Sequence, residues 1–137
     1  MRGLDYGCGP VPVLSKILIK KGLACENYDP LFGPSFPEGT FDFIFCTEVF
    51  EHFHYVRSEI DRLSRLLKSN GLLTVMTWLH NGSEDFEKWS YIRDRTHVIF
   101  FNLDTFGYIC REWKFVPLWH DHDRVIVLRK NAEKQNK

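Results

Sequence analysis

The strongest chemical signal in the sequence is a short glycine-containing segment that begins with an acidic residue. Residues 5–10 read Asp-Tyr-Gly-Cys-Gly-Pro and lie between a short apolar stretch and a helix-like one. Two glycines permit a tight turn and a close approach of the backbone to a ligand. Asp29 ends the next predicted strand, where its carboxylate can accept hydrogen bonds from a ribose. A plain strand-to-helix turn is the alternative, but the two carboxylates favour a ligand site.

The residues of this loop disfavour a phosphate-containing ligand. A dinucleotide-binding loop has three glycines and directs free N–H groups at a pyrophosphate. Pro10 and Pro12 have no N–H group, and Pro12 stands at the place of the third glycine. Asp5 would repel a pyrophosphate, whereas it would attract a ligand that carries an ammonium and a sulfonium group. S-adenosylmethionine has both charges and no phosphate, so we expect it as the cofactor rather than a nicotinamide dinucleotide.

Two histidines are candidates for removing a proton from a methyl acceptor. Glu48, Glu51 and His52 lie where a strand ends and a long helix is predicted to begin. The helix dipole favours acidic residues at that position, which is sufficient to explain Glu51. His52 follows the strand end that faces the predicted site, and His97 is the second candidate base. For His97, a hydrogen-bonded structural histidine is an equal alternative.

No metal site is predicted from the sequence. His120 and His122 alternate with two aspartates, which superficially resembles a set of metal ligands. They fall in a predicted hairpin connection, so a solvated turn is favoured. The four cysteines form no C-x-x-C pair and lie mostly in apolar stretches, as reduced thiols do. This cysteine usage predicts a cytoplasmic location.

The elements that position these residues alternate between strand and helix. Apolar spacing predicts helices near residues 11–21, 49–68 and 104–113, and strands near residues 23–28, 41–46 and 72–78. This order is typical of an α/β fold with a mostly parallel sheet between two helical layers, a Rossmann-like three-layer sandwich. Two alternating segments, 115–119 and 124–128, predict a C-terminal hairpin whose last strand is antiparallel.

Length and composition predict one domain of ordinary size. The chain has 137 residues, of which 44% are hydrophobic, and we assign residues 1–130 to the domain and 131–137 to a flexible tail. Eighteen basic residues balance eighteen acidic ones, so a basic nucleic-acid binder is excluded as a class. No apolar segment approaches the ~20 residues that span a bilayer, so no membrane association is predicted.

Several motifs in order resemble the class I S-adenosylmethionine-dependent methyltransferases, and most closely the small bacterial type 23 methyltransferase domains. These motifs together span residues 4–106. They are Leu-Asp-Tyr-Gly-Cys-Gly-Pro at 4–10, Tyr-Asp-Pro at 28–30, the segment from Phe41 to Phe53, the segment from Leu66 to Val75, Trp-Ser-Tyr-Ile-Arg-Asp-Arg-Thr-His-Val at 89–98, and Phe100-Phe101.

The resemblance implies a role in cofactor binding for each group of matching residues. The methionine end of the cofactor would lie against the loop residues Asp5, Gly7, Cys8 and Gly9, and Asp29 would hold the ribose. Residues Cys46, Thr47 and Glu48 would pass beneath the cofactor, with His52 near the site. The third glycine common in the family loop is replaced by Val11.

Two departures from the family pattern concern the architecture. Only eleven residues, 30–40, join the second strand to the next one, too few for a helix and a strand, so the usual third strand is expected to be missing. Adenine would then rely on Pro30, Leu31 and Phe32 or on backbone groups. The helices that precede the first strand in the family are also expected to be missing. They would be supplied by further sequence upstream of Met1.

The sequence therefore predicts a methyltransferase that acts on a small-molecule acceptor. The alternative is a non-catalytic or truncated domain of the same fold that only binds the cofactor. Because the missing helices would leave one face of the sheet thinly covered, apolar surface around Leu4 and Ile44 is expected to be available for an upstream segment or a second copy of the chain. A homodimer is accordingly an expectation.

Overall fold

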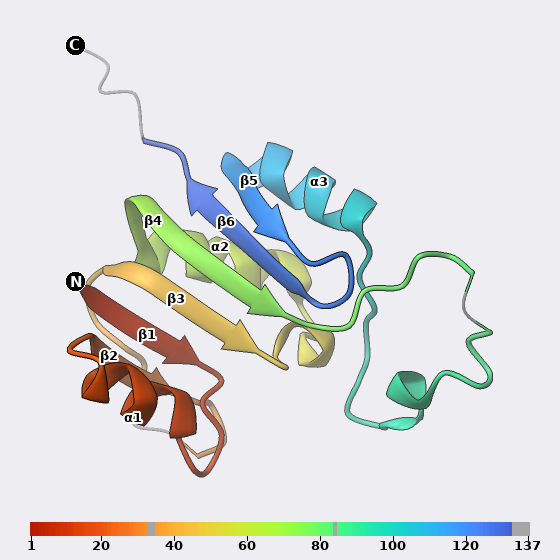
Figure 1. Cartoon of the computed structure of the whole chain (residues 1–137), viewed down its shortest axis with the longest axis horizontal. Coiled ribbons are helices and arrows are strands. Elements are labelled where there is room, and N and C mark those ends of the chain that lie inside the picture. The colour runs from red at the N-terminus through yellow and green to blue at the C-terminus, as the bar shows by residue number, and fades with distance from the viewer. Residues whose placement is uncertain (33–34, 84, 133–137) are drawn as a thin grey trace.

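The computed structural model describes residues 1–32, 35–83 and 85–132. Its six strands form one sheet in the order β2-β1-β3-β4-β6-β5 (Figure 1). The strands are Arg2–Tyr6 (β1), Ala24–Tyr28 (β2), Phe41–Thr47 (β3), Leu67–Met76 (β4), Phe115–His120 (β5) and Val125–Lys130 (β6). The helices are Val13–Lys20 (α1), Val56–Leu66 (α2) and Leu103–Trp113 (α3), with short 3-10 turns at Phe50–His52 (η1) and Ser90–Arg93 (η2).

The strand directions confirm the predicted α/β class with a mostly parallel sheet. Strands β2, β1, β3 and β4 run parallel, whereas β6 is antiparallel to both β4 and β5. The hairpin between β5 and β6 contains Asp121, whose Oδ1 accepts the N–H groups of residues 123, 124 and 125. In the described part of residues 30–40 no strand lies between β2 and β3, so β2 is an edge of the sheet.

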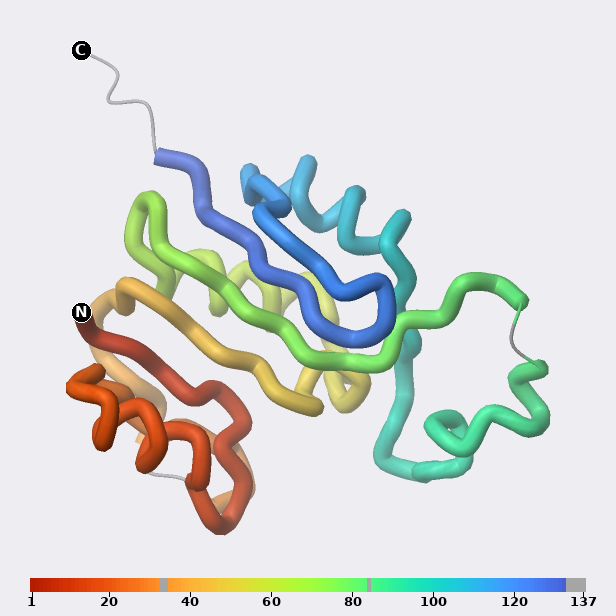
Figure 2. Tube along the Cα trace, in the orientation of Figure 1, coloured from red at the N-terminus to blue at the C-terminus, as the bar shows by residue number. Residues whose placement is uncertain are grey.

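The two faces of the sheet are covered unequally. Helices α2 and α3 contact each other, with α2 packed behind β4 and α3 packed on β5, whereas α1 lies in front and packs mainly on β2 and β1 (Figures 1 and 2). Because side chains alternate along a strand, each strand contributes every second residue to the core under α2 and α3. That core includes Leu4, Ile44, Leu73, Val75 and Ile126.

Unequal covering of the two faces was expected, but the prediction that Leu4 and Ile44 lie on the thinly covered face was wrong. Leu4 and Ile44 are 0% and 1% exposed and belong to the core under α2 and α3. Their neighbours Phe43 and Phe45 point to the opposite face, where their ring centroids lie 5.7 Å apart. The ring of Phe43 lies across Gly3, where a Cβ atom would stand 1.9 Å from it.

The long helix predicted at 49–68 is divided in the structure. Residues 50–52 form η1, α2 begins only at Val56, and β4 already begins at Leu67 rather than at residue 72. At η1, Phe50 and Phe53 are buried against each other with ring centroids 4.9 Å apart, and Glu51 is buried beside them.

A long excursion follows β4 and returns to the sheet before α3. Residues 77–102 leave the carboxyl end of β4 and carry η2 outside the sheet (Figure 2). An isolated parallel β-bridge between Leu79 and Phe101 joins the two ends of this excursion. None of the described helices is long and apolar enough to cross a membrane. From residue 133 on, the predicted tail lies outside the described residues.

Candidate functional site

The carboxyl ends of β1, β2 and β3 bring three predicted site residues, Asp5, Asp29 and Glu48, to one edge of the sheet. Tyr6 pairs with Tyr28, and Asp5 pairs with Phe45. The residues that follow these strands, among them Asp29 and Glu48, therefore emerge on the same side. In open α/β sheets this edge is where ligands bind.

The glycine loop uses its own N–H groups to hold itself in place. The N–H groups of Gly7 and Cys8 both donate to the Tyr28 carbonyl oxygen, at 2.7 and 3.1 Å. The Gly9 N–H donates to Asp29 Oδ2 at 2.9 Å, and Pro10 has no N–H group. Residues 7–10 therefore have no N–H group left for a phosphate.

The two glycines of the loop differ in what surrounds them. Gly7 has a φ of 88°, and a Cβ atom there would stand 2.3 Å from Val49 Cγ2. Gly9 has a φ of 66°, and a Cβ atom there would meet nothing within 4 Å. Gly7 thus lets the loop touch the turn after β3, while Gly9 leaves the loop open on its outer side.

Asp29 is placed to serve both the loop and a ligand. Its Oδ1 accepts the Leu31 N–H at 2.9 Å, in addition to the bond from Gly9 to Oδ2. A carboxylate has about four acceptor positions, so two remain for the hydroxyls of a ribose. Asp29 is therefore also the residue that sets the shape of the loop, a role that the sequence did not indicate.

Asp5 lies beneath the loop in a setting that penalises its charge. It is 4% exposed, and burial together with the nearby charge of Asp29 raises its pKa to about 6. A positively charged ligand would favour the ionised carboxylate at this position. The chemistry of the edge thus matches a cationic cofactor without phosphate, which fits S-adenosylmethionine.

A cavity of about 350 Å³ lies beside the loop at the edge strand β2. Of the predicted cofactor residues, Cys8 and Gly9 line it, together with Pro10, Pro12, Glu26, Asn27 and Phe32. The buried Oδ1 of Asn27 has no hydrogen-bond partner among the described residues. Asn27 was not among the predicted site residues, although its position two residues before Asp29, near the end of β2, was a usable signal.

Other predicted cofactor residues lie at the same edge with different exposures. Leu31 is 81% exposed, and Thr47 and Glu48 are partly exposed at the end of β3. The side chain of Cys46 is fully buried in the core, so only its backbone reaches the edge. Pro30 directly follows Asp29 in the turn after β2.

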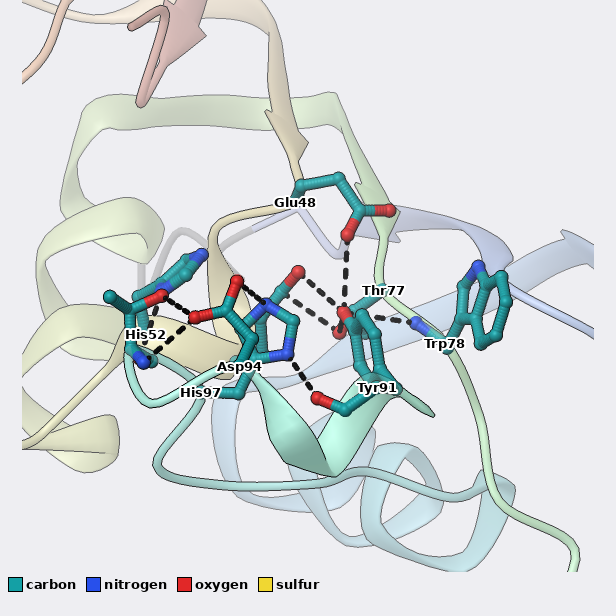
Figure 3. A network of polar contacts seen from close by, with 9 residues as sticks. Glu48, His52, Thr77, Trp78, Tyr91, Asp94 and His97 are labelled. Carbon is teal, nitrogen blue, oxygen red and sulfur yellow. Dashed lines mark hydrogen bonds and ion pairs between the residues drawn. The ribbon is translucent and has the colours of Figure 1, made fainter. Parts of the chain in front are cut away.

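A second group of polar side chains lies just beyond the end of β3 (Figure 3). Glu51 is fully buried, and its Oε2 accepts the Thr77 hydroxyl at 2.9 Å. The Tyr91 hydroxyl donates to Glu51 Oε1 and also lies 3.2 Å from Glu48 Oε2. Glu51 is therefore held by buried hydrogen bonds, and its explanation as a helix-dipole residue was wrong because no α-helix begins there.

Glu48 has two features that set it apart from a surface carboxylate. Its φ is 54°, a left-handed conformation that side chains other than glycine rarely adopt. Its pKa is raised to about 7, chiefly by burial and then by the hydrogen bond and charge of Glu51. Glu48 can therefore gain or lose a proton near neutral pH.

The two candidate bases, His52 and His97, lie beside each other in this group. Their ring centroids are 4.9 Å apart. His52 Nδ1 lies 2.9 Å from the Thr96 carbonyl oxygen, and His97 Nδ1 lies 2.6 Å from the Tyr91 carbonyl oxygen. Because a carbonyl oxygen only accepts, each Nδ1 carries a proton, and in the neutral form of each ring the lone pair lies on Nε2.

The family model for a methyltransferase domain matches residues 1–117. The chain belongs to this family. Membership confirms the resemblance stated from the motifs, and with it S-adenosylmethionine as the cofactor of this methyltransferase domain. No curated protein sequence matches the chain closely enough to serve as a relative.

Solved structures of other proteins share the fold of this methyltransferase domain at low sequence identity. The YcgJ protein from Bacillus subtilis is 16% identical with a TM-score of 0.63, and the match covers 96% of this chain and 92% of that one. 1,6-Didemethyltoxoflavin-N1-methyltransferase from Burkholderia thailandensis is 16% identical with a TM-score of 0.72, over 95% and 71% of the two chains. Magnesium protoporphyrin IX methyltransferase from Synechocystis is 11% identical with a TM-score of 0.65, over 96% and 70%.

The methyltransferase domain contains polar partners that the sequence analysis did not identify. Thr77 and Tyr91 hold Glu51, and the N–H group of Trp78 donates to the Tyr91 hydroxyl at 3.4 Å. The indole of Trp78 stacks on Tyr91 with ring centroids 5.3 Å apart. Thr77 and Trp78 are the last two residues of the strand predicted at 72–78, which was an available signal, whereas nothing in the sequence connected Tyr91 to Glu51.

Proposed function

We propose that this methyltransferase domain transfers the methyl group of S-adenosylmethionine to a small-molecule acceptor that binds beside Glu48, Tyr91 and His97. The observation that carries the proposal is the hydrogen bonding of the glycine loop. Its N–H groups are all engaged within the protein, so the loop has no donor for a phosphate, while Asp5 and Asp29 attract a cation.

In this proposal the cofactor lies along the edge formed by the ends of β1, β2 and β3. Asp29 accepts the hydrogen bonds of the ribose with its two remaining acceptor positions. The methionine end of the cofactor lies against Asp5 and against the open side of Gly9. Pro30 and Leu31 lie next to the adenine, and the backbone of residues 46–48 passes beneath the cofactor. The contact of Gly7 with Val49 supports this arrangement because it joins the loop to the turn that carries Glu48.

Aromatic side chains beside Glu48 support a small acceptor with a flat apolar part. Trp78 stacks on Tyr91, and Trp89 also contacts Tyr91, with ring centroids 5.3 Å apart. Pockets for small molecules combine such apolar walls with a few polar groups. The related enzyme from Burkholderia thailandensis was solved with 1,6-didemethyltoxoflavin bound, which agrees with a small-molecule acceptor here.

The bound cofactor supplies a methyl group on a positively charged sulfur, ready for in-line displacement. The protein then has to align the acceptor and remove its proton. We assign this role to His52 and His97, because their Nδ1 atoms donate to carbonyl oxygens and the Nε2 atom of each ring, in its neutral form, has a free lone pair. As the acceptor atom forms its bond to the methyl carbon, the carbon–sulfur bond would break to release S-adenosylhomocysteine, and the proton of the acceptor would pass to an Nε2 atom.

Calorimetric titration with S-adenosylhomocysteine and with NAD tests the cofactor part of the proposal. We expect S-adenosylhomocysteine to bind and NAD not to bind. Asp29→Ala should weaken S-adenosylhomocysteine binding by about 10- to 100-fold, because a charge-assisted acceptor is worth roughly 1.5–3 kcal/mol. Glu38→Ala, at an exposed site in the segment after β2, is the control and should bind like the wild type. Equal affinity of wild type and Asp29→Ala would refute the ribose assignment.

Methyl transfer to a panel of small acceptors tests the catalytic part. Release of S-adenosylhomocysteine that depends on an added acceptor is the expected result. Tight cofactor binding without turnover on any acceptor would instead support the alternative of a non-catalytic binding domain.

A further inference from the structure

Glu51, His52 and His97 bring together three atoms of the types that bind metal ions. One nitrogen of each imidazole and one oxygen of the Glu51 carboxylate all lie within 4.8 Å of one another. Glu51 is fully buried, the side chain of His97 is 9% exposed, and His52 is exposed. The sequence did not predict this set, because His97 lies 45 positions after His52 (97 − 52) and no local pattern connects the two.

The imidazoles are oriented as metal-binding histidines are. A histidine that binds a metal through one ring nitrogen almost always donates its other ring N–H to a carbonyl or a carboxylate. Both rings do so here, His52 to the Thr96 carbonyl oxygen and His97 to the Tyr91 carbonyl oxygen. Each Nε2 is therefore the unprotonated atom that a cation would need.

The carboxylate of Glu51 is also held by outer partners. Thr77 and Tyr91 each donate a hydroxyl hydrogen bond to one of its oxygens. Each oxygen keeps a second lone pair, so these bonds orient the carboxylate without blocking it. A nearby cation would stabilise a buried carboxylate that is fixed in this way.

We propose that Glu51, His52 and His97 form a binding site for a divalent transition-metal cation of the Zn²⁺ or Co²⁺ type. Two imidazoles and one carboxylate are a ligand set that such cations take, and imidazole selects them over Mg²⁺ and Ca²⁺. Three protein ligands leave coordination positions open for water or for an oxygen atom of a substrate. The inference concerns metal binding by the chain itself. Because a cation would occupy the Nε2 lone pairs of His52 and His97, these histidines act as bases in the proposed function only when no cation is bound.

The ligand atoms have to approach one another slightly to bind the cation. Zinc–nitrogen distances of about 2.0–2.1 Å place tetrahedral ligand atoms roughly 3.4 Å apart. His52 is exposed, so rotation of its side chain can close the site without disturbing the core. The Asp94 carboxylate, 3.6 Å from His97 Nε2, adds negative charge beside the site.

The competing explanation is a set of charge contacts without metal. A protonated His97 could interact with Asp94 through Nε2 and with its other neighbours by hydrogen bonds alone. That arrangement predicts no stoichiometric binding of a cation. It also predicts that replacing His52 does not change the affinity of the chain for a metal ion.

The test is calorimetric titration of the full chain with Zn²⁺ after treatment with a chelator, and visible absorption spectroscopy with Co²⁺. The wild type should bind one cation per chain, with Mg²⁺ binding much more weakly. His52→Ala and His97→Ala should each weaken Zn²⁺ binding by at least about tenfold. His54→Ala removes an exposed histidine two positions from His52 and should leave the affinity unchanged.

Two further measurements keep the result interpretable. Thermal unfolding of each variant shows whether it is folded, and the exposed His52 is the safer substitution because its removal opens no cavity. S-adenosylhomocysteine affinity, measured without metal, separates a failure of this inference from a failure of the proposed function. Absence of stoichiometric Zn²⁺ binding in the wild type, or equal Zn²⁺ affinity of wild type, His52→Ala and His97→Ala, would overturn the proposal.

Discussion

The glycine loop and the histidine–carboxylate group lie at the same edge of the sheet but are assembled in different ways. The loop is formed by residues 5–10 and held by the end of β2, through bonds from its N–H groups to Tyr28 and Asp29. The histidine–carboxylate group, defined as Glu48, Glu51, His52, Tyr91 and His97, joins the end of β3 to the excursion after β4. The first region depends on adjacent parallel strands, and the second depends on a long loop folding back.

The two regions also differ in what their carboxylates respond to. Burial and the charge of Asp29 raise the pKa of Asp5 to about 6, so its environment favours a positive ligand. Burial and Glu51 raise the pKa of Glu48 to about 7, which suits an exchange of protons. This difference agrees with our proposal that the loop binds the cofactor while the histidine–carboxylate group acts on the acceptor.

Replacing the candidate bases gives the largest expected effect and tests this division directly. His97→Ala or His52→Ala should lower kcat by about 10²- to 10⁴-fold, the usual contribution of proton transfer, while S-adenosylhomocysteine affinity stays near the wild-type value. His54→Ala is the matched control and should retain full turnover. If both variants keep full activity on a true acceptor, neither histidine is the base. If they lose cofactor affinity instead, the two regions do not have separate roles.

Substitution of the two loop glycines tests the contact that joins the regions. Gly7→Ala should destabilise the protein by roughly 2–4 kcal/mol and weaken cofactor binding, because its Cβ would overlap Val49 at a positive φ. Gly9→Ala should cost only about 1 kcal/mol, since its Cβ meets no atom within 4 Å. Thermal or urea unfolding measures both values. A Val49→Ala background should partly restore Gly7→Ala, and similar losses in both glycine variants would contradict the contact.

The smallest expected effect concerns the pH dependence of stability at Asp5. The folded-state pKa of about 6 exceeds the ordinary value of 3.8, so the folded protein favours the protonated carboxyl. Stability from this group is present below about pH 4, falls as pH rises to about 6 and is level above that. Asp5→Asn should therefore raise the unfolding free energy by roughly 1–2 kcal/mol at pH 8 and have little effect at pH 3.5.

Ligand binding by the Asp5→Asn variant tests whether the charge of Asp5 acts on the cofactor. Asp5→Asn should weaken binding of S-adenosylmethionine more than binding of S-adenosylhomocysteine, because only the former carries the sulfonium charge. Calorimetry with both ligands at pH 8 measures the difference. Equal losses for the two ligands would place the charge of Asp5 away from the sulfur.

The order of elements was readable from the sequence because it depends on local patterns. Apolar spacing identified α1 and α3, the polar residues 120–123 identified the hairpin, and the short 30–40 connection left β2 as the edge among the described strands. The division of the 49–68 helix was not readable. Phe50, Glu51 and Phe53 are buried at this division, and Glu51 accepts a hydrogen bond from Thr77, a distant partner that no local pattern shows.

The same distinction holds within the candidate site. The sequence by itself determined the loop with its carboxylates, since glycine, proline and aspartate act through their own backbone freedom, missing N–H groups and charge. Only the tertiary structure decided that Glu51 is buried and that Tyr91, Thr77 and the two imidazoles meet it. The hydrogen bonds of Thr77 and Tyr91 to Glu51 join residues 26 and 40 positions apart, and their energy comes from burial and hydrogen bonding that no local pattern encodes.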